Sequence, residues 1–250
     1  MTGPGGSGSH LWSESLMAIK SVYISDPVVR DNLISIRDEE HRHLSVSRAF
    51  VGEEIEIFDG QGNVLSAKIS ALERRETQAR VTGKRQVARD SHELILGLSL
   101  IRHSAFELAL EKAVEAGVTR IIPFVAARSN TKDAGRTDRL QRIIVEAAKQ
   151  SKRYHLPVLQ ETVSFGDIVK IEAPTKIVFS ERNGSELKDV IRKSPVLYLI
   201  GPEGGWTDEE LSAAQAHGFA LVGLGNTILR ADTAAIVGTA LVRYELKNAK

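Results

Sequence analysis

Val196-Leu197-Tyr198-Leu199-Ile200-Gly201-Pro202-Glu203-Gly204-Gly205 joins an apolar run directly to a loop rich in glycine. The same order returns downstream, where Ala220-Leu221-Val222 precedes Leu224-Gly225-Asn226-Thr227-Ile228-Leu229-Arg230. A polar helix candidate that opens at Thr207 separates the two stretches. Ligands of open α/β sheets bind at the carboxyl ends of strands, and glycine there lets the backbone approach a ligand closely. We therefore expect the functional site at these two loops.

Apolar runs and amphipathic helix candidates alternate in the part of the chain that contains these loops. The run 94–100 is nearly continuous in apolar residues, which is typical of a strand buried on both faces. Further strands are predicted at 120–125, 176–179, 197–200 and 220–222, and helices at 106–116, 136–151 and 233–246. The alternation predicts an α/β domain with a mainly parallel sheet over residues 89–250.

Residues 17–88 have a different pattern, because short strand candidates follow one another with tight turns. Strands are predicted at 21–24, 54–58, 64–69 and 78–81, and a short helix at 38–46. Asp59-Gly60 is a strong hairpin signal between two of these strands. The pattern predicts a small β-barrel. Residues 1–16 are rich in glycine and serine and are expected to form a flexible leader.

Composition excludes several classes of protein and site. No apolar run is long enough to span a bilayer, so no membrane partner is expected. The absence of cysteine excludes disulfides, thiolate metal sites and a cysteine nucleophile, and it fits a cytoplasmic location. His41 and His43 have no third ligand nearby in the sequence, so no metal is expected.

Positive charge is concentrated between Arg120 and Arg153. This stretch has nine basic and three acidic residues, although the formal net charge of the whole chain is only +1. A local basic face can bind phosphates even on a nearly neutral protein. A solvated helix surface explains the same pattern, so both interpretations stay open at this point.

Taken together, the two loops resemble the knot motifs of the RsmE family, which are 16S ribosomal RNA uridine N3-methyltransferases of the SPOUT superfamily. The resemblance rests on Leu199-Ile200-Gly201-Pro202-Glu203-Gly204-Gly205 and on Leu224-Gly225-x-x-Ile228-Leu229-Arg230-x-Asp232-Thr233-Ala234. Three further segments match the family, namely Glu111-Lys112-Ala113-x-Glu115-x-Gly117-Val118, Arg128-Ser129 and Glu146-Ala147-Ala148-x-Gln150-Ser151-x-Arg153. In the amino-terminal part, the matches are His43-Leu44, Arg48, Gly52 and Phe58-Asp59-Gly60.

The resemblance implies a fold, a cofactor and partners. Residues 17–88 would form a PUA-like RNA-binding barrel, and residues 89–250 a SPOUT domain with a trefoil knot, in a homodimer that acts on 16S ribosomal RNA or the small subunit. S-adenosylmethionine would bind in the knot, against residues Phe179, Ser180, Glu181, Ile200, Gly201, Glu203, Gly205, Leu224, Gly225, Ile228 and Leu229. RNA would contact His43, Arg48, Arg128 and Arg153.

Arg230 and Asp232 are the candidate catalytic residues. Methyl transfer to a uridine N3 requires the loss of the N3 proton, and a nearby cation favours the anionic base. Arg230 could supply that cation or bind the target phosphate. Asp232 could orient Arg230 or accept a proton. The alternatives are a surface arginine that caps a carbonyl, and an N-cap for the helix predicted from Thr233.

The second loop differs from the pattern of the RsmE family at a few positions. Asn226-Thr227 stands where Pro-Arg is usual, and Ala231-Asp232-Thr233 stands where Thr-Glu-Thr is usual. Two further functions therefore stay open. One is a knotted methyltransferase with a different RNA target, and the other is a catalytically inactive RNA-binding homologue.

Overall fold

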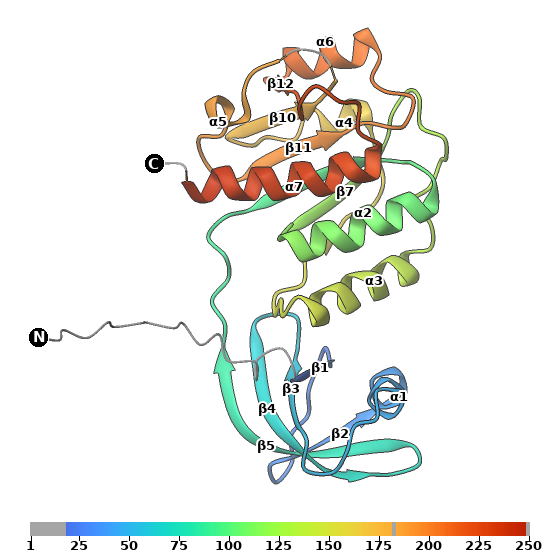
Figure 1. Cartoon of the computed structure of the whole chain (residues 1–250), viewed down its shortest axis with the longest axis vertical. Coiled ribbons are helices and arrows are strands. Elements are labelled where there is room, and N and C mark those ends of the chain that lie inside the picture. Colours follow the sequence, from blue (N-terminus) through green and yellow to red (C-terminus); the bar gives the residue numbers. More distant parts are fainter. Residues whose placement is uncertain (1–18, 182–183, 249–250) are drawn as a thin grey trace, which may run out of the picture. The chain divides into compact units, whose positions relative to one another are not determined.

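A computed structural model describes residues 19–181 and 184–248, which belong to two compact units (Figure 1). Of the described residues, the first unit comprises 19–59 and 63–86, and the second comprises 60–62, 87–181 and 184–248. The leader expected over residues 1–16 lies outside the described residues. The two units are described separately below.

The first unit is a curled five-stranded sheet with one helix, α1 (Asp38–Val46). Its strand order is β1 (Lys20–Tyr23), β3 (Glu54–Phe58), β4 (Asn63–Leu72), β5 (Glu76–Gln86) and β2 (Leu33–Arg37). All pairings are antiparallel except that of β1 with β3. Among the described strands, β1 and β2 are the two edges and do not pair with each other, so the expected barrel is observed as a curled sheet.

Strand β2 was not predicted from the sequence. It follows a tight turn in which Asp31 and Asn32 both have left-handed backbones, with φ of 50° and 59°. Arg30 and Leu33 close this turn through two backbone hydrogen bonds of 2.9 and 2.7 Å. Two consecutive left-handed residues are the requirement of a type I′ hairpin turn, and Asp and Asn tolerate that conformation. The Asp-Asn pair was therefore the signal for this strand.

The second unit contains a seven-stranded sheet in which every strand pairing is parallel. Its order is β12 (Ala220–Val222), β10 (Thr175–Phe179), β11 (Val196–Ile200), β6 (Leu94–Ser99), β7 (Arg120–Val125) and β8 (Val158–Leu159), and β9 (Val163–Ser164) also pairs with β7. Every residue of β6, β10 and β11 is buried. The mainly parallel sheet predicted from the sequence is confirmed.

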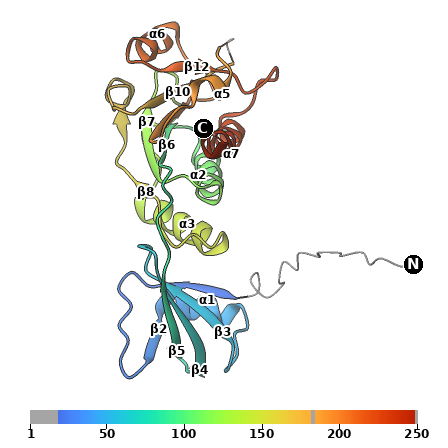
Figure 2. The same cartoon turned by 90° about the vertical axis from the view of Figure 1, so that its left-hand side faces the viewer.

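Helices cover both faces of this sheet (Figure 2). One face packs against α2 (His103–Ala116), α3 (Thr137–Gln150), α5 (Leu187–Val190) and α7 (Ala231–Asn248). The other face packs against α4 (Phe165–Ile168) and α6 (Asp208–Ala216). Only the strand ends and their loops are left to form a site.

Helix α7 begins earlier than predicted. The Ala234 N–H donates to the Arg230 carbonyl over 2.8 Å, so the first helical turn starts at Ala231 and not at Thr233. Asp232 lies inside that turn. The alternative interpretation of Asp232 as the N-cap residue is therefore wrong.

A side chain at Gly97 on β6 would collide with the core around it. A Cβ there would lie 2.6 Å from Ile168 Cδ1 on α4 and would also collide with Leu199 on β11. We predict that Gly97→Val lowers the free energy of unfolding by about 1–3 kcal/mol, because the filled core must move. Gly166→Ala is the matched control, since its nearest neighbour lies 3.7 Å away. Urea unfolding followed by circular dichroism measures both, and equal stabilities would show that this core has room.

Candidate functional site

A pocket of about 510 Å³ lies at the carboxyl ends of β10, β11 and β12 in the second unit. Every residue predicted to bind the cofactor lines it, and so does Arg230. The further lining residues were not predicted to bind the cofactor, and they are Pro202, Gly204, Trp206, Thr227, Ala231 and Ala234. Three loops that are distant in the sequence are thus brought to one cavity, because parallel strands end at the same edge of a sheet.

The loop after β11 is held in a fixed shape. The Gly205 N–H donates to the Pro202 carbonyl over 2.9 Å, and Gly205 has a φ of +71°, which favours glycine. The loop then enters α6 through a capping box, in which Thr207 Oγ1 accepts the Glu210 N–H and Glu210 Oε2 accepts the Thr207 N–H. This wall of the pocket is therefore preorganised.

Trp206 directly follows the same loop and is buried. The sequence analysis did not identify it as part of the site. Its indole Nε1–H donates to the Phe179 carbonyl over 2.8 Å, and its ring stacks on Phe124 with centroids 6.0 Å apart. A Cβ at Gly201 would lie 2.8 Å from Trp206 Cε2. Gly201 is therefore required by the packing of the tryptophan. An aromatic residue that directly follows a glycine loop was the available signal, because a buried indole needs both packing and an acceptor.

Glu203 lines the pocket, but its carboxylate bonds to neighbouring loops. Glu203 Oε2 accepts a hydrogen bond of 2.8 Å from Asn130 Nδ2. Glu203 Oε1 accepts a longer one of 3.4 Å from Arg102 Nε. The side chain therefore ties the pocket wall to the loops that follow β7 and β6.

Arg230 and Asp232 form an ion pair beside the pocket. Arg230 Nη2 lies 2.9 Å from Asp232 Oδ2, and the Arg230 side chain is 74% exposed whereas that of Asp232 is 6% exposed. Asp232 Oδ1 also accepts the Thr233 N–H over 2.8 Å. Burial by itself would raise the pKa of Asp232, but the Thr233 N–H and the Arg230 guanidinium outweigh burial and lower the pKa. A carboxylate with a lowered pKa is a weak proton acceptor.

Arg128, predicted to contact RNA, bonds to the pocket wall. Its Nη1 donates to the Gly204 carbonyl over 2.9 Å. The arginine therefore supports the glycine loop directly, and part of its side chain stays exposed.

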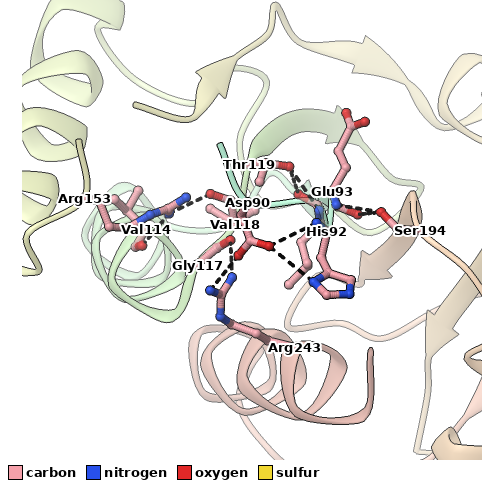
Figure 3. Close-up of polar contacts among 11 residues, drawn as sticks. Asp90, His92, Glu93, Val114, Gly117, Val118, Thr119, Arg153, Ser194 and Arg243 are labelled. Atoms are coloured by element: carbon pink, nitrogen blue, oxygen red, sulfur yellow. Dashed lines mark hydrogen bonds and ion pairs between the residues drawn. The ribbon is translucent and has the colours of Figure 1, made fainter. Parts of the chain in front are cut away.

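Arg153, also predicted to contact RNA, has a role in the scaffold (Figure 3). Its Nη1 donates to the carbonyls of Val114 and Val118, each over 2.7 Å, at the end of α2. Arg243 on α7 lies beside it and bonds to Asp90 Oδ2 over 2.7 Å. Burial, with a smaller effect of Arg243, lowers the pKa of Arg153 to about 10. The Arg153 guanidinium already donates to two protein carbonyls, so the structure does not support the predicted contact between Arg153 and RNA.

His43 and Arg48, the other two residues predicted to contact RNA, belong to the first unit. Both side chains are exposed, His43 in the last turn of α1 and Arg48 in the turn that follows. Arg48 has a φ of +55°.

The described residues were also searched for a metal site and a membrane span. Within residues 19–181 and 184–248, no group of three or more His, Cys, Asp or Glu side chains is placed to hold a metal ion. Of the helices in the described part of the chain, none is long and apolar enough to cross a membrane.

Known proteins with similar sequences decide the family. The model of a family described as "RNA methyltransferase domain" matches residues 88–243. Ribosomal RNA small subunit methyltransferase E of Synechocystis sp. is 31% identical over 94% of this chain and 80% of that protein. The chain belongs to the ribosomal RNA small subunit methyltransferase E family. The member from Rickettsia conorii is 25% identical over 91% of this chain and 96% of that protein.

Solved structures of the family have the same fold. Ribosomal RNA small subunit methyltransferase E from Neisseria gonorrhoeae, bound to S-adenosyl methionine, has a TM-score of 0.84 and 28% identity over 90% of this chain and 97% of that chain. A methyltransferase from Legionella pneumophila in complex with the same cofactor has a TM-score of 0.84 and 25% identity over the same shares.

The lowered pKa of Asp232 predicts how stability depends on pH. Its folded pKa lies below the ordinary value of 3.8, so the carboxylate stabilises the fold above that value and this contribution is lost as pH falls through the folded pKa. Asp232→Asn should therefore cost about 0.5–1 kcal/mol at pH 7, the size of a charge at a helix N-terminus. The difference from the wild type should shrink below about pH 4. Urea unfolding at several pH values measures it, and a difference that grows in acid would show a raised pKa.

Proposed function

We propose that this chain is an S-adenosylmethionine-dependent methyltransferase that methylates N3 of a uridine in 16S ribosomal RNA. The observation that carries the proposal is that the loops after β10, β11 and β12 line one common pocket. Its volume falls in the range of about 300–1,000 Å³ that is typical of small-molecule sites. Two solved relatives with this fold contain S-adenosylmethionine, which supports the same cofactor here.

The residues of the pocket fit such a cofactor. Backbone groups of the loops 201–205 and 224–229 are proposed to contact an adenine edge, because the glycines in these loops let a ligand approach the backbone closely. Apolar side chains of Phe179, Leu224 and Leu229 offer packing for the ring. When bound, S-adenosylmethionine supplies a methyl group that is open to attack by a ring nitrogen.

Arg230 is the proposed catalytic residue of this chain. Its exposed guanidinium stands at the pocket and keeps its charge at any working pH. Its positive charge stabilises the uracil anion that forms as the N3 proton passes to solvent water. Asp232 is proposed to orient Arg230 and not to take the proton, because its pKa is lowered by the groups that it binds.

The finer architecture and the partners belong to the same proposal. We propose that the first unit is a PUA-like RNA-binding domain, with His43 and Arg48 on its RNA face, and that the second unit is knotted. The resemblance of residues 199–205 and 224–234 to the knot motifs of the family supports the knot. Arg128 remains a candidate RNA contact. Cytoplasmic 16S ribosomal RNA or the small subunit is the proposed partner.

A homodimer is also proposed. Apolar side chains are exposed near the pocket and on the neighbouring helices α7 and α2, namely Ile228 at 87%, Tyr244 at 65%, Leu108 at 40% and Leu241 at 39%. We propose that these side chains contribute to the interface between the subunits. Sedimentation at micromolar concentration tests it, and a monomer would contradict it.

Gly201 gives a test of cofactor binding. We predict that Gly201→Val weakens S-adenosylmethionine binding at least about tenfold, because the added carbons displace Trp206, whose bond to the Phe179 carbonyl joins two walls of the pocket. Gly166→Ala, which lies outside the pocket, should bind as the wild type does. Isothermal titration calorimetry on variants with unchanged circular dichroism measures both. Unaltered affinity in Gly201→Val would remove this loop from the cofactor site.

Arg230 gives a test of catalysis. We predict that Arg230→Ala reduces turnover on 16S ribosomal RNA by about a hundredfold to a thousandfold, the usual effect of losing one contact to the developing charge. Its melting temperature should fall by no more than about 2–4 °C, because the Thr233 N–H still binds Asp232, and its affinity for S-adenosylmethionine should stay unchanged.

Arg136→Ala is the matched control for Arg230→Ala. Arg136 forms an exposed ion pair of 2.8 Å with Asp138, two residues away, as Arg230 does with Asp232. Turnover at saturating RNA should be unaffected in this control. Wild-type turnover in Arg230→Ala would make Arg230 a structural residue, and loss of cofactor affinity would assign it to the pocket wall.

A further inference from the structure

A segment of the first unit, residues 46–52, exposes apolar side chains to which no role has yet been given. Val46, Phe50 and Val51 are 79%, 61% and 59% exposed. They lie within six residues of one another, at the end of α1 and in the turn that follows. Apolar side chains that are exposed together mark interaction sites more often than those exposed singly.

The backbone of this segment is held in place. The Gly52 N–H donates to the Ile69 carbonyl over 2.8 Å, which ties the turn to β4. The Phe50 N–H donates to Glu53 Oε2 over 3.1 Å, and the Glu53 N–H donates back to the Phe50 carbonyl over 3.1 Å. Phe50 is therefore presented from a fixed turn, so little conformational freedom is lost when a ligand covers its ring.

A cation stands two residues before this ring. Arg48 is exposed, and no carboxylate is paired with it among the residues that the structure describes. Its φ of +55° belongs to the left-handed turn that ends α1, in which the Arg48 N–H donates to the Ser45 carbonyl over 3.2 Å and the Ala49 N–H donates to the Leu44 carbonyl over 3.0 Å. The backbone that carries Arg48 is therefore fixed by the end of the helix.

We propose that Phe50 stacks on an unpaired base of the RNA and that Arg48 contacts the adjoining phosphate. The inference rests on the proposed function, in which RNA is the substrate. An exposed ring two residues from an exposed cation offers a partner for both parts of a nucleotide, the flat base and the anionic phosphate. An apolar protein surface would match the ring and the valines but would leave the charge of Arg48 without a partner.

Binding of the full-length chain to protein-free 16S ribosomal RNA, measured by filter binding at several salt concentrations, tests the assignment. Phe50→Ala and Phe50→Leu should each bind at least about tenfold more weakly, because neither offers a flat ring, and Phe50→Tyr should bind within about twofold of the wild type. The slope of log K against log salt should not change in Phe50→Ala. Arg48→Ala should reduce that slope by about one, since a phosphate contact is lost.

Val28→Ala is the matched control, because Val28 is an apolar side chain of the first unit that is also 59% exposed. It should bind RNA as the wild type does. Wild-type affinity in Phe50→Leu would overturn stacking and assign the segment to an apolar protein surface. An equal loss in Val28→Ala would also overturn it.

The outcomes separate this site from the proposed function. If the wild type binds the RNA and Phe50→Ala binds equally well, only the stacking site is wrong. If the wild type binds no RNA while it binds S-adenosylmethionine, both the RNA substrate and the stacking site are wrong.

Discussion

Burial of β6, β10 and β11 on both faces is the constraint on which the site depends. Helices cover the two faces of the sheet, so these strands meet solvent only at their ends. The parallel pairing then sets the carboxyl ends of β10, β11 and β12 side by side. Loops that leave this edge can use backbone groups for binding, because the core already fixes where each loop starts. The pocket is thus a consequence of the sheet, and the glycines shape it.

The sequence predicts the sheet and the loops that line the pocket, for a physical reason. Buried parallel strands are continuous apolar runs, and such runs need no distant partner to be recognised. The glycine loops follow those runs directly, so their place at the sheet edge can be inferred from local sequence alone. Strand β2 was not predicted, because its signal is the left-handed backbone of Asp31 and Asn32. Hydrophobic periodicity does not reveal such a turn. The start of α7 shifted because the Arg230 carbonyl accepts the first helical hydrogen bond.

Charged residues were harder to assign, because their roles depend on contacts that are distant in the sequence. Arg153 looks like an RNA contact in a basic stretch, yet its guanidinium binds the carbonyls of Val114 and Val118. Arg128 supports the Gly204 carbonyl. Arg230 is different, since its side chain is largely exposed and its partner lies only two residues away. The positive charge between Arg120 and Arg153 therefore includes arginines whose guanidinium groups donate to protein carbonyls.

The central claim is that this chain transfers a methyl group from S-adenosylmethionine to N3 of a uridine in 16S ribosomal RNA. The direct measurement is incubation of the purified chain with methyl-labelled S-adenosylmethionine and 16S ribosomal RNA, followed by digestion to nucleosides and mass spectrometry. The account predicts that the label appears in N3-methyluridine and in no other nucleoside. Label in a different nucleoside, or no label in RNA from protein-free transcripts and from small subunits alike, would contradict it.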